Sequence, residues 1–282
     1  MPLARSGDLV DRARDAGVGV AAFNVITLEH AEGIVLAAER TGTPVILQIS
    51  HNAVRFHGSL LPIAAAALAQ ASGSGVDIAV HLDHVEDVSL LHQAAGAGFS
   101  SAMFDAGNLP YTDNVDPTRE AVEWAHSNGL WLEAELGYVG GKPDAPASAH
   151  APGARTDPDE AAQYVAATGV DALAVAVGSS HAMTSRTAAL DADLIARLRA
   201  AVTVPLVLHG SSGVPDDQLR NGIRAGLTKI NVGTALNVGL TAAIRQRLAA
   251  EPDLTDPRTY LADGRAAVSA TAEHLIGIIS GS

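Results

Sequence analysis

Three histidines in this sequence, His84, His181 and His209, each follow a run of apolar residues typical of a buried strand. Taken singly, a histidine at a strand end is usually a solvated side chain. Three at equivalent places on three strands predict a shared site, because chance would scatter them over helices and loops. Three neutral imidazoles with one open position are a common catalytic zinc arrangement, so we expect these residues to bind Zn²⁺. Other histidines do fall on helices and loops and are expected to be inert: His30, His57, His92, His126 and His274.

Carboxylates accompany these histidines. Asp83 directly precedes His84, and Asp105 and Glu135 end two further predicted strands. Asp105 and Glu135 are expected to accept hydrogen bonds from the metal-bound imidazoles and so to fix their orientation. Asp83 is expected to be the catalytic group that moves a proton on a substrate hydroxyl. His81, within the same strand, is expected to support the site from behind.

Small and hydroxyl-bearing residues follow the last two predicted strands. Residues 210–213 read Gly-Ser-Ser-Gly, and residues 230–234 read Ile-Asn-Val-Gly-Thr before a helix. Backbone N–H groups and the hydroxyls of Ser212 and Thr234 could close on an anion there, and the helix N-terminus adds a favourable partial charge. A metal beside a phosphate site and a free carboxylate indicates carbanion chemistry, in which the metal polarises a carbonyl.

The elements that must position these residues alternate along the chain. Strand patterns separated by amphipathic helical patterns imply parallel pairing with right-handed crossovers. The expected strands are 18–25, 45–50, 77–86, 101–105, 130–137, 172–178, 205–210 and 228–233. The expected helices are 28–40, 64–71, 88–97, 115–128, one that begins at Asp157-Pro158, 190–200, 216–225, 235–249 and 260–279.

Eight strand–helix units in a chain of this length predict an α/β fold, a TIM (β/α)8 barrel. We expect a single domain over residues 1–282, with the last helix as a C-terminal extension. Residues at the C-terminal strand ends build the active site in such barrels. The loop over 138–156 is longer than the usual connection, which makes it a candidate lid.

Composition limits the possible partners. The chain has 282 residues, of which 48% are hydrophobic, enough for a large core. Its net charge of -13 argues against nucleic acid or an anionic membrane as a partner, because phosphate backbones are bound by clustered Lys and Arg. A small phosphorylated substrate needs only a local anion site. The sequence has no cysteine, no apolar leader and no run long enough to span a bilayer, so we expect a cytoplasmic protein.

In these motifs the sequence resembles the zinc-dependent class II fructose-bisphosphate and tagatose-bisphosphate aldolases. The resemblance covers nearly the whole chain, and the motifs occur in the family's order. They are residues 22–24 (Ala-Phe-Asn), 48–50 (Gln-Ile-Ser), 81–84 (His-Leu-Asp-His), 133–137 (Glu-Ala-Glu-Leu-Gly), 140–141 (Gly-Gly), 177–181 (Val-Gly-Ser-Ser-His), 209–213 (His-Gly-Ser-Ser-Gly), 229–231 (Lys-Ile-Asn) and 256–258 (Asp-Pro-Arg).

The resemblance implies roles by position. His84, His181 and His209 match the family's zinc ligands, and Asp83 matches the aspartate that deprotonates the C4 hydroxyl during cleavage. Asn231 matches the asparagine that contacts dihydroxyacetone phosphate. Further matches lie near the substrate or its phosphate: Asn24, Gln48, Ser50, Gly210, Ser212, Gly233 and Thr234. The resemblance also implies a monovalent cation, Na⁺ or K⁺, near the phosphate, and a homodimer or homotetramer.

Two positions around the expected phosphate and lid depart from the family pattern. Ala182 follows the second zinc histidine, where the family usually has a glycine whose backbone closes on phosphate and cation. Alanine keeps the N–H but disfavours a positive φ. Pro143 stands where the family has a glutamate used for proton exchange at C3, and Asp144 is the expected substitute.

A third departure concerns the distal phosphate. Ala262 stands where fructose-bisphosphate aldolases often have an arginine for that group, and Arg258, Arg265 or Arg186 could serve instead. The half of the site for dihydroxyacetone phosphate therefore matches the family, while the half for the aldehyde differs.

The leading hypothesis is a zinc-dependent aldolase that reversibly cleaves a ketose bisphosphate, such as fructose 1,6-bisphosphate or tagatose 1,6-bisphosphate, to dihydroxyacetone phosphate and an aldehyde. A ketose 1-phosphate is the alternative substrate. A metal-dependent hydrolase ranks lower, because the first strand lacks the His-x-His pair of such barrels, and a non-catalytic sugar-phosphate binder is a third class. A Schiff-base aldolase needs a lysine at the barrel mouth, and the only lysines are Lys142 on the long loop and Lys229 near the base of the eighth strand.

Overall fold

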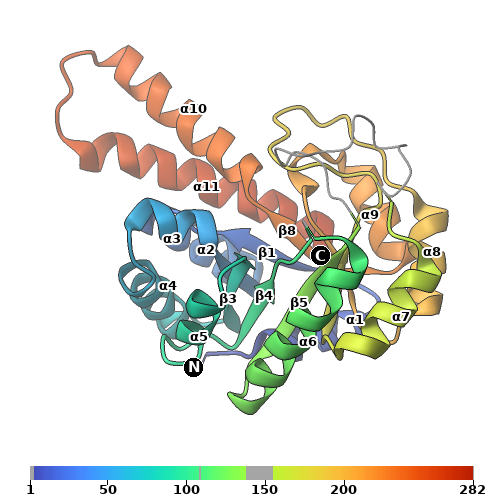
Figure 1. Ribbon diagram of the computed structural model, residues 1–282. Coiled ribbons are helices and arrows are strands. Elements are labelled where there is room, and N and C mark those ends of the chain that lie inside the picture. The colour runs from blue at the N-terminus through green and yellow to red at the C-terminus, as the bar shows by residue number, and fades with distance from the viewer. Residues whose placement is uncertain (1–2, 108, 138–154, 282) are drawn as a thin grey trace.

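Eight parallel strands close into a barrel in sequence order, which confirms the predicted TIM-barrel fold (Figure 1). The computed structural model describes residues 3–107, 109–137 and 155–281. Each strand pairs with the next, and β8 pairs with β1. The strands are β1 Val20–Asn24, β2 Val45–Ser50, β3 Ile78–Val85, β4 Ser101–Phe104, β5 Trp131–Leu136, β6 Ala172–Val175, β7 Leu206–Leu208 and β8 Leu227–Val232.

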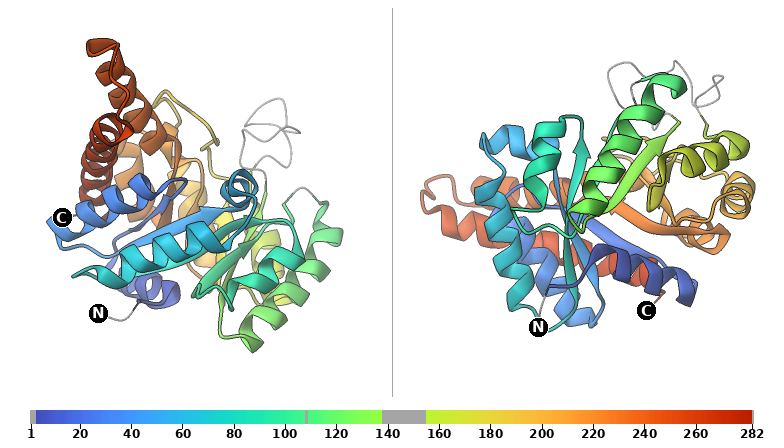
Figure 2. Two further views of the ribbon diagram at one scale, coloured as in Figure 1. Left: turned by 90° about the vertical axis from the view of Figure 1, so that its left-hand side faces the viewer. Right: turned by 60° about the horizontal axis from the view of Figure 1, so that its bottom comes forward.

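Helices surround the barrel and connect its strands (Figures 1 and 2). Apolar side chains on their inner faces pack against the outward-facing residues of the strands and form the main hydrophobic core. The helices are α1 Ser6–Ala16, α2 Leu28–Thr41, α3 His51–His57, α4 Leu61–Gly73, α5 Val88–Ala94, α6 Tyr111–Ser127, α7 Pro158–Thr168, α8 Ala192–Ala201, α9 Asp216–Ala225, α10 Thr234–Ala250 and α11 Pro257–Ser280, with a 3₁₀ turn at Ser211–Gly213.

The N-terminal end of the barrel is closed by α1. Its apolar residues Leu9, Val10 and Ala13 are buried against inward-facing strand residues in a second core cluster, whose barrel members are Val20, Ala22, Ile46 and Ala79. Successive side chains of a strand point to opposite faces. Inward-facing positions near α1 are therefore mostly apolar, although Ser101 Oγ donates to Ser6 Oγ of α1. The polar residues considered below face the barrel interior nearer its other end.

The last two helices, α10 and α11, form a hairpin that extends away from the barrel (Figures 1 and 2). The inner half of α11 packs against α2 and supplies buried residues such as Val268, Ala272 and Ile276. By contrast, Leu236 is the buried residue of α10 within this chain. The hairpin includes the predicted C-terminal extension.

Among the residues that the structure describes, no helix combines the length and apolar character needed to cross a membrane.

Candidate active site

The strand register places the polar residues of β1, β2 and β3 in two inward-facing layers. Gln48 pairs with Asn24 on one side and with His81 on the other, and Ser50 pairs with Asp83 one step nearer the C-terminal rim. Residues paired in register share a face of the sheet. Because alternate residues of each strand face the barrel interior, these side chains gather at its mouth.

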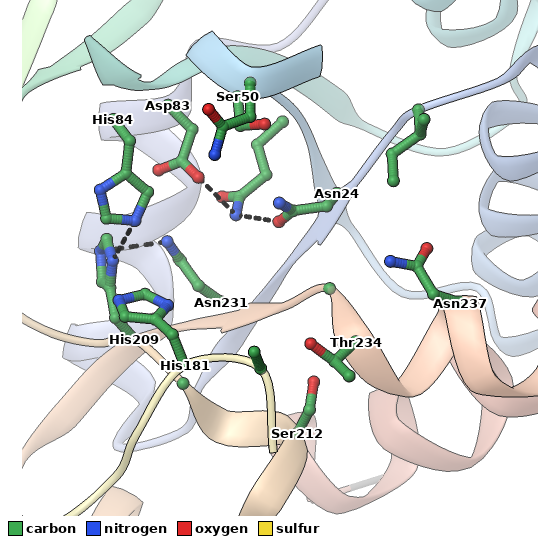
Figure 3. Close-up of a pocket in the computed structure, with 16 residues that line it drawn as sticks. Asn24, Ser50, Asp83, His84, His181, His209, Ser212, Asn231, Thr234 and Asn237 are labelled. Carbon is green, nitrogen blue, oxygen red and sulfur yellow. Dashed lines mark hydrogen bonds between the residues drawn. The ribbon is translucent and has the colours of Figure 1, made fainter. Parts of the chain in front are cut away.

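His84 is adjacent to Asp83 in sequence, yet both side chains line the same pocket (Figure 3). The pairing of β3 with β4 shifts register between Leu82 and Val85, and His84 has a φ of 51°. A bulge of this kind redirects a side chain that strict alternation would send to the other face. The bulge costs strain at a non-glycine residue but brings an acid and an imidazole to one site.

His84, His181 and His209 lie together, with their candidate ligand atoms all within 4.8 Å of one another. His84 lies near the end of β3, and His209 directly follows β7. His181 lies on the loop after β6, a strand that is shorter than predicted. The loops after β6 and β7 can approach closely because Gly210, with a φ of 66°, has no Cβ. A Cβ there would lie 2.6 Å from the carbonyl of Ser180.

Two carboxylates orient the cluster. His84 Nδ1 is 2.7 Å from Asp105 Oδ2, as expected for an orienting acceptor. His209 Nε2 is 2.8 Å from Glu133 Oε1, a carboxylate for which no orienting role was expected. Glu135, which was expected to orient an imidazole, lies 3.8 Å from His209 Nδ1, the ring nitrogen that faces the other histidines. In each pair the carboxylate holds the outer ring nitrogen and turns the other nitrogen toward the cluster.

The donor set fits a divalent metal. With Nδ1 of His84 and Nε2 of His209 committed to carboxylates, His84 Nε2 and His209 Nδ1 face each other at 2.9 Å. Two imidazole lone pairs at that distance repel unless a proton or a metal ion lies between them. Burial opposes a charge on His84, but Asp83 and Asp105 outweigh this effect and raise its pKa to about 9. A site that stabilises an imidazolium also favours a bound cation.

Beneath the cluster lies a buried lysine. Lys229 Nζ is 2.8 Å from Glu133 Oε2 and 2.8 Å from Asn231 Oδ1. Lys229 and Glu133 are both fully buried, and Asn231 Nδ2 also contacts His209 Nε2 at 3.1 Å. Lys229 therefore braces the two residues that touch the far side of His209, and its ammonium does not line the pocket.

Asp83 is buried at the pocket wall beside His84. Gln48 Nε2 donates to Asp83 Oδ2 at 3.3 Å and to Asn24 Oδ1 at 2.5 Å, so one amide joins three neighbouring strands. His81 Nε2 lies 4.0 Å from Asp83 Oδ1 on the other side, and its Nδ1 bonds Ser101. Burial raises the pKa of Asp83, which makes its ionised form a stronger base than an exposed aspartate.

The other half of the pocket is lined by the residues expected to bind phosphate (Figure 3). Ser212 Oγ accepts the N–H of Ala235 at the start of α10, which leaves the hydroxyl proton of Ser212 available to a ligand. Thr234 opens the same helix. These predicted residues line this pocket: Asn24, Gln48, Ser50, Ala182, Gly210, Ser212, Asn231, Gly233 and Thr234.

Ala182 adopts a backbone conformation that is unfavourable for alanine. Its φ is 58°, in the left-handed region, although alanine is strained there by about 1–2 kcal/mol. The chain thus keeps the backbone path expected for glycine and adds a methyl group to the pocket wall.

The candidate distal-phosphate arginines are not brought to this pocket within the described part of the chain. The Arg258 side chain is 89% exposed and pairs with Asp256. Arg265 pairs with Glu32 at 2.7 Å. Arg186 bonds the Val214 carbonyl at 3.0 Å and pairs with Asp216. Asp144 lies outside the described residues, as does most of the predicted lid.

Comparison with known proteins identifies the family. The family model described as class II fructose-bisphosphate aldolase matches residues 4–282. The chain belongs to this family. It is therefore a metal-dependent aldolase, a lyase that cleaves carbon–carbon bonds.

Relatives of this aldolase span nearly the same length. It is 38% identical over 274 residues to the probable fructose-bisphosphate aldolase of Bacillus subtilis (strain 168), which covers 96% of this chain and 95% of the relative. It is 36% identical over 273 residues to the fructose-bisphosphate aldolase of Geobacillus stearothermophilus, covering 96% and 94%.

Solved structures agree. The YdjI aldolase from Escherichia coli K12 superposes on this aldolase with a TM-score of 0.85 at 31% identity, covering 98% of this chain and 97% of that one. A putative fructose-1,6-bisphosphate aldolase from Coccidioides immitis gives a TM-score of 0.86 at 29% identity, covering 98% and 96%.

Several pocket residues of this aldolase were not expected from the sequence. Ile26, Asn52 and Asn237 line the pocket. Glu133 and Lys229, which belong to the quoted motifs but had no expected role, support it. The signal for Glu133 was present, since it shares strand parity with Glu135 and must therefore face the barrel interior. Asn237 lies on the first turn of α10, where no strand-end rule would find it.

Proposed function

We propose that this aldolase binds Zn²⁺ through His84, His181 and His209 and reversibly cleaves a ketose phosphate to dihydroxyacetone phosphate and an aldehyde. The observation that carries the proposal is the position of Asp83 in a pocket with the three histidines at one end and Ser212 and Thr234 at the other. A bound Zn²⁺ would polarise the substrate carbonyl and stabilise the negative charge that develops as the carbon–carbon bond breaks.

The chain's own residues supply the rest of the chemistry. Asp83, raised in pKa by burial, accepts the proton of the C4 hydroxyl, and the electron pair of that O–H bond forms the aldehyde carbonyl as the C3–C4 bond breaks. Gln48 holds the carboxylate of Asp83 in place. Asn231 contacts the dihydroxyacetone half, and Lys229 fixes the orientation of its amide.

The phosphate of that half is placed in the loops after β7 and β8. Backbone groups at Ala182, Gly210 and Gly233 and the hydroxyls of Ser212 and Thr234 line that part of the pocket. The N-terminus of α10 adds partial positive charge. A monovalent cation, Na⁺ or K⁺, is proposed beside the phosphate.

Two substrate classes remain in this proposal. A ketose bisphosphate is favoured by the names of the Bacillus and Geobacillus relatives. A ketose 1-phosphate is favoured by the engagement of Arg186 and Arg265 with carboxylates elsewhere and by the exposed position of Arg258. Asp144 is kept as the proposed group for proton exchange at C3.

Assembly and location complete the proposal. We propose a homodimer or homotetramer, supported by the projecting α10–α11 hairpin, which leaves Val238 and Leu248 exposed. Apolar side chains of this kind are often covered by a partner. Action on a phosphorylated metabolite suits the cytoplasmic location expected from the sequence.

An assay of dihydroxyacetone phosphate tests the function. The zinc-loaded enzyme would be given fructose and tagatose 1,6-bisphosphates and the matching 1-phosphates, with Asp83→Asn as control. We expect release from at least one substrate by the wild type and almost none by the variant. No release from any of the four would overturn the proposal, and the ratio of kcat/KM between bisphosphates and monophosphates decides the substrate class.

A further inference from the structure

His30, expected to be inert, is a buried residue that joins the start of α2 to the start of α10. Its side chain is only 3% exposed. Nδ1 lies 3.4 Å from the backbone nitrogen and 3.1 Å from Oγ1 of Thr27, the residue before α2. Nε2 lies 3.1 Å from Oδ1 of Asn237, one of the residues that line the active-site pocket.

These contacts determine the tautomer of His30. A backbone N–H can only donate, so Nδ1 must be the acceptor of the Thr27 amide. The proton of the neutral ring therefore lies on Nε2, which donates to Asn237 Oδ1. Burial lowers the pKa of His30, which favours the same neutral form.

The tautomer in turn determines which end of the Asn237 amide meets the ligand. With Oδ1 held by His30, the Nδ2 group is the end left for the pocket. Figure 3 shows Asn237 on the side of the pocket that holds Thr234 and Ser212, with its amide nitrogen turned toward the pocket interior. A donor there suits an anion, whereas a flipped amide would present an oxygen and repel it.

We propose that Asn237 is a phosphate-binding residue that donates its Nδ2–H to the substrate phosphate, and that His30 is the positioning residue that holds this amide in the donating orientation. The inference rests on the proposed function, which puts the phosphate in this half of the pocket. Asn237 adds a side-chain donor to the hydroxyls of Ser212 and Thr234, one turn along the helix whose N-terminus faces the anion.

Binding of inorganic phosphate and of dihydroxyacetone phosphate to the zinc-loaded protein, measured by isothermal titration calorimetry, tests the role of Asn237. We expect Asn237→Ala to weaken both by about tenfold or more, the usual effect of losing a hydrogen bond to a charged group. Asn237→Asp should weaken both further, because it adds a negative charge. The matched control is Asn221→Ala on α9, outside the pocket, which should bind as the wild type does. Wild-type affinity in Asn237→Ala would overturn the proposal.

The role of His30 is tested by a double-mutant cycle with the same probes. His30→Phe keeps a ring of similar volume but cannot donate to Asn237. We expect it to raise KM for the phosphorylated substrate while kcat stays near the wild-type value, and to add no further loss of phosphate affinity in the Asn237→Ala background. Equal losses in both backgrounds would show that His30 acts on folding rather than on the amide.

The two proposals fail separately. Phosphate binding needs no cleavage. If the protein cleaved no ketose phosphate but Asn237→Ala weakened phosphate binding, the proposed function would be overturned and the present inference kept. If the protein cleaved a ketose phosphate but Asn237→Ala bound phosphate as tightly as the wild type, the proposed function would stand and the role of Asn237 would be overturned.

Discussion

His84 Nε2 and His209 Nδ1 face each other at 2.9 Å, although the two residues come from β3 and from the loop after β7. Asp105 and Glu133 hold the opposite nitrogens and so prevent either ring from turning away. Such an arrangement is stable only with a positive charge between the rings. The carboxylates around the histidines therefore suit the three rings to the Zn²⁺ that we propose they bind.

Removal of the buried ammonium of Lys229 should weaken the support that Glu133 gives to His209. Lys229→Met leaves Glu133 buried without its cationic partner, which should lower the free energy of unfolding by about 3–5 kcal/mol. Zinc affinity should fall about 10- to 100-fold, because Glu133 orients His209. Chemical denaturation and competition with a chelator measure the two effects.

The double variant Lys229→Met with Glu133→Gln is the control for that prediction. It removes both charges, and the amide can still accept from His209, so most of the lost stability should return. If the double variant were as unstable as the single one, the ion pair would not be the cause.

Loss of the proton acceptor should stop turnover without loss of the metal. Asp83→Asn keeps the shape and the acceptor for Gln48 but is not a base. We expect kcat to fall by about 10²–10⁴-fold, the usual contribution of a general base. Zinc content, measured by atomic absorption, should stay at the wild-type level. Turnover near the wild-type rate would remove Asp83 from this role.

The strain at Ala182 should be recoverable. Ala182→Gly relieves a left-handed alanine, offset partly by the greater freedom of glycine in the unfolded chain, so stability should rise by about 0.5–1 kcal/mol. The same substitution at Ala242, on an exposed position of α10, should instead lower stability by about 1 kcal/mol. Denaturant unfolding measures the change in unfolding free energy for each variant. A decrease in both variants would show that Ala182 is not strained.

His30 should make stability depend on pH. Burial lowers its pKa below the usual 6.5, against smaller opposing contributions from Asn237 and Glu29. The unfolded chain therefore binds more protons, and the stability due to neutral His30 is full above pH 6.5 and is lost as pH falls through the folded pKa. The difference in unfolding free energy between the wild type and His30→Phe should shrink by about 1 kcal/mol per unit of pKa shift. A constant difference from pH 8 to about pH 5 would contradict this.

The sequence predicted the barrel because its strand and helix periods alternate clearly, and most strand bounds agree within a few residues. It did not predict α1 or α3. The seven residues of α3 follow β2 directly, begin at the Ser50 cap and leave Phe56 exposed, so they carry no clear apolar stripe. The pattern of α1 is short, and its partners are inside the barrel rather than nearby in sequence.

The candidate site was predictable where a residue ends a strand. Asp83, His84 and His209 follow from that rule, whereas β6 ends at Val175 and His181 lies on the loop beyond it. The bulge at His84 could not be predicted, because it depends on the pairing of β3 with β4. Nor could the Lys229–Glu133 pair, which joins β8 to β5 across the barrel interior. The link from His30 to Asn237 joins residues 207 positions apart in the chain, which no local pattern encodes.

Zinc titration of the metal-free enzyme, with release of dihydroxyacetone phosphate as the readout, tests the central claim most directly. After complete chelation we expect cleavage of the preferred ketose phosphate to be lost. Added Zn²⁺ should restore it up to about one equivalent per chain, as a single site formed by the three histidines requires. Full cleavage by the metal-free protein would contradict the claim.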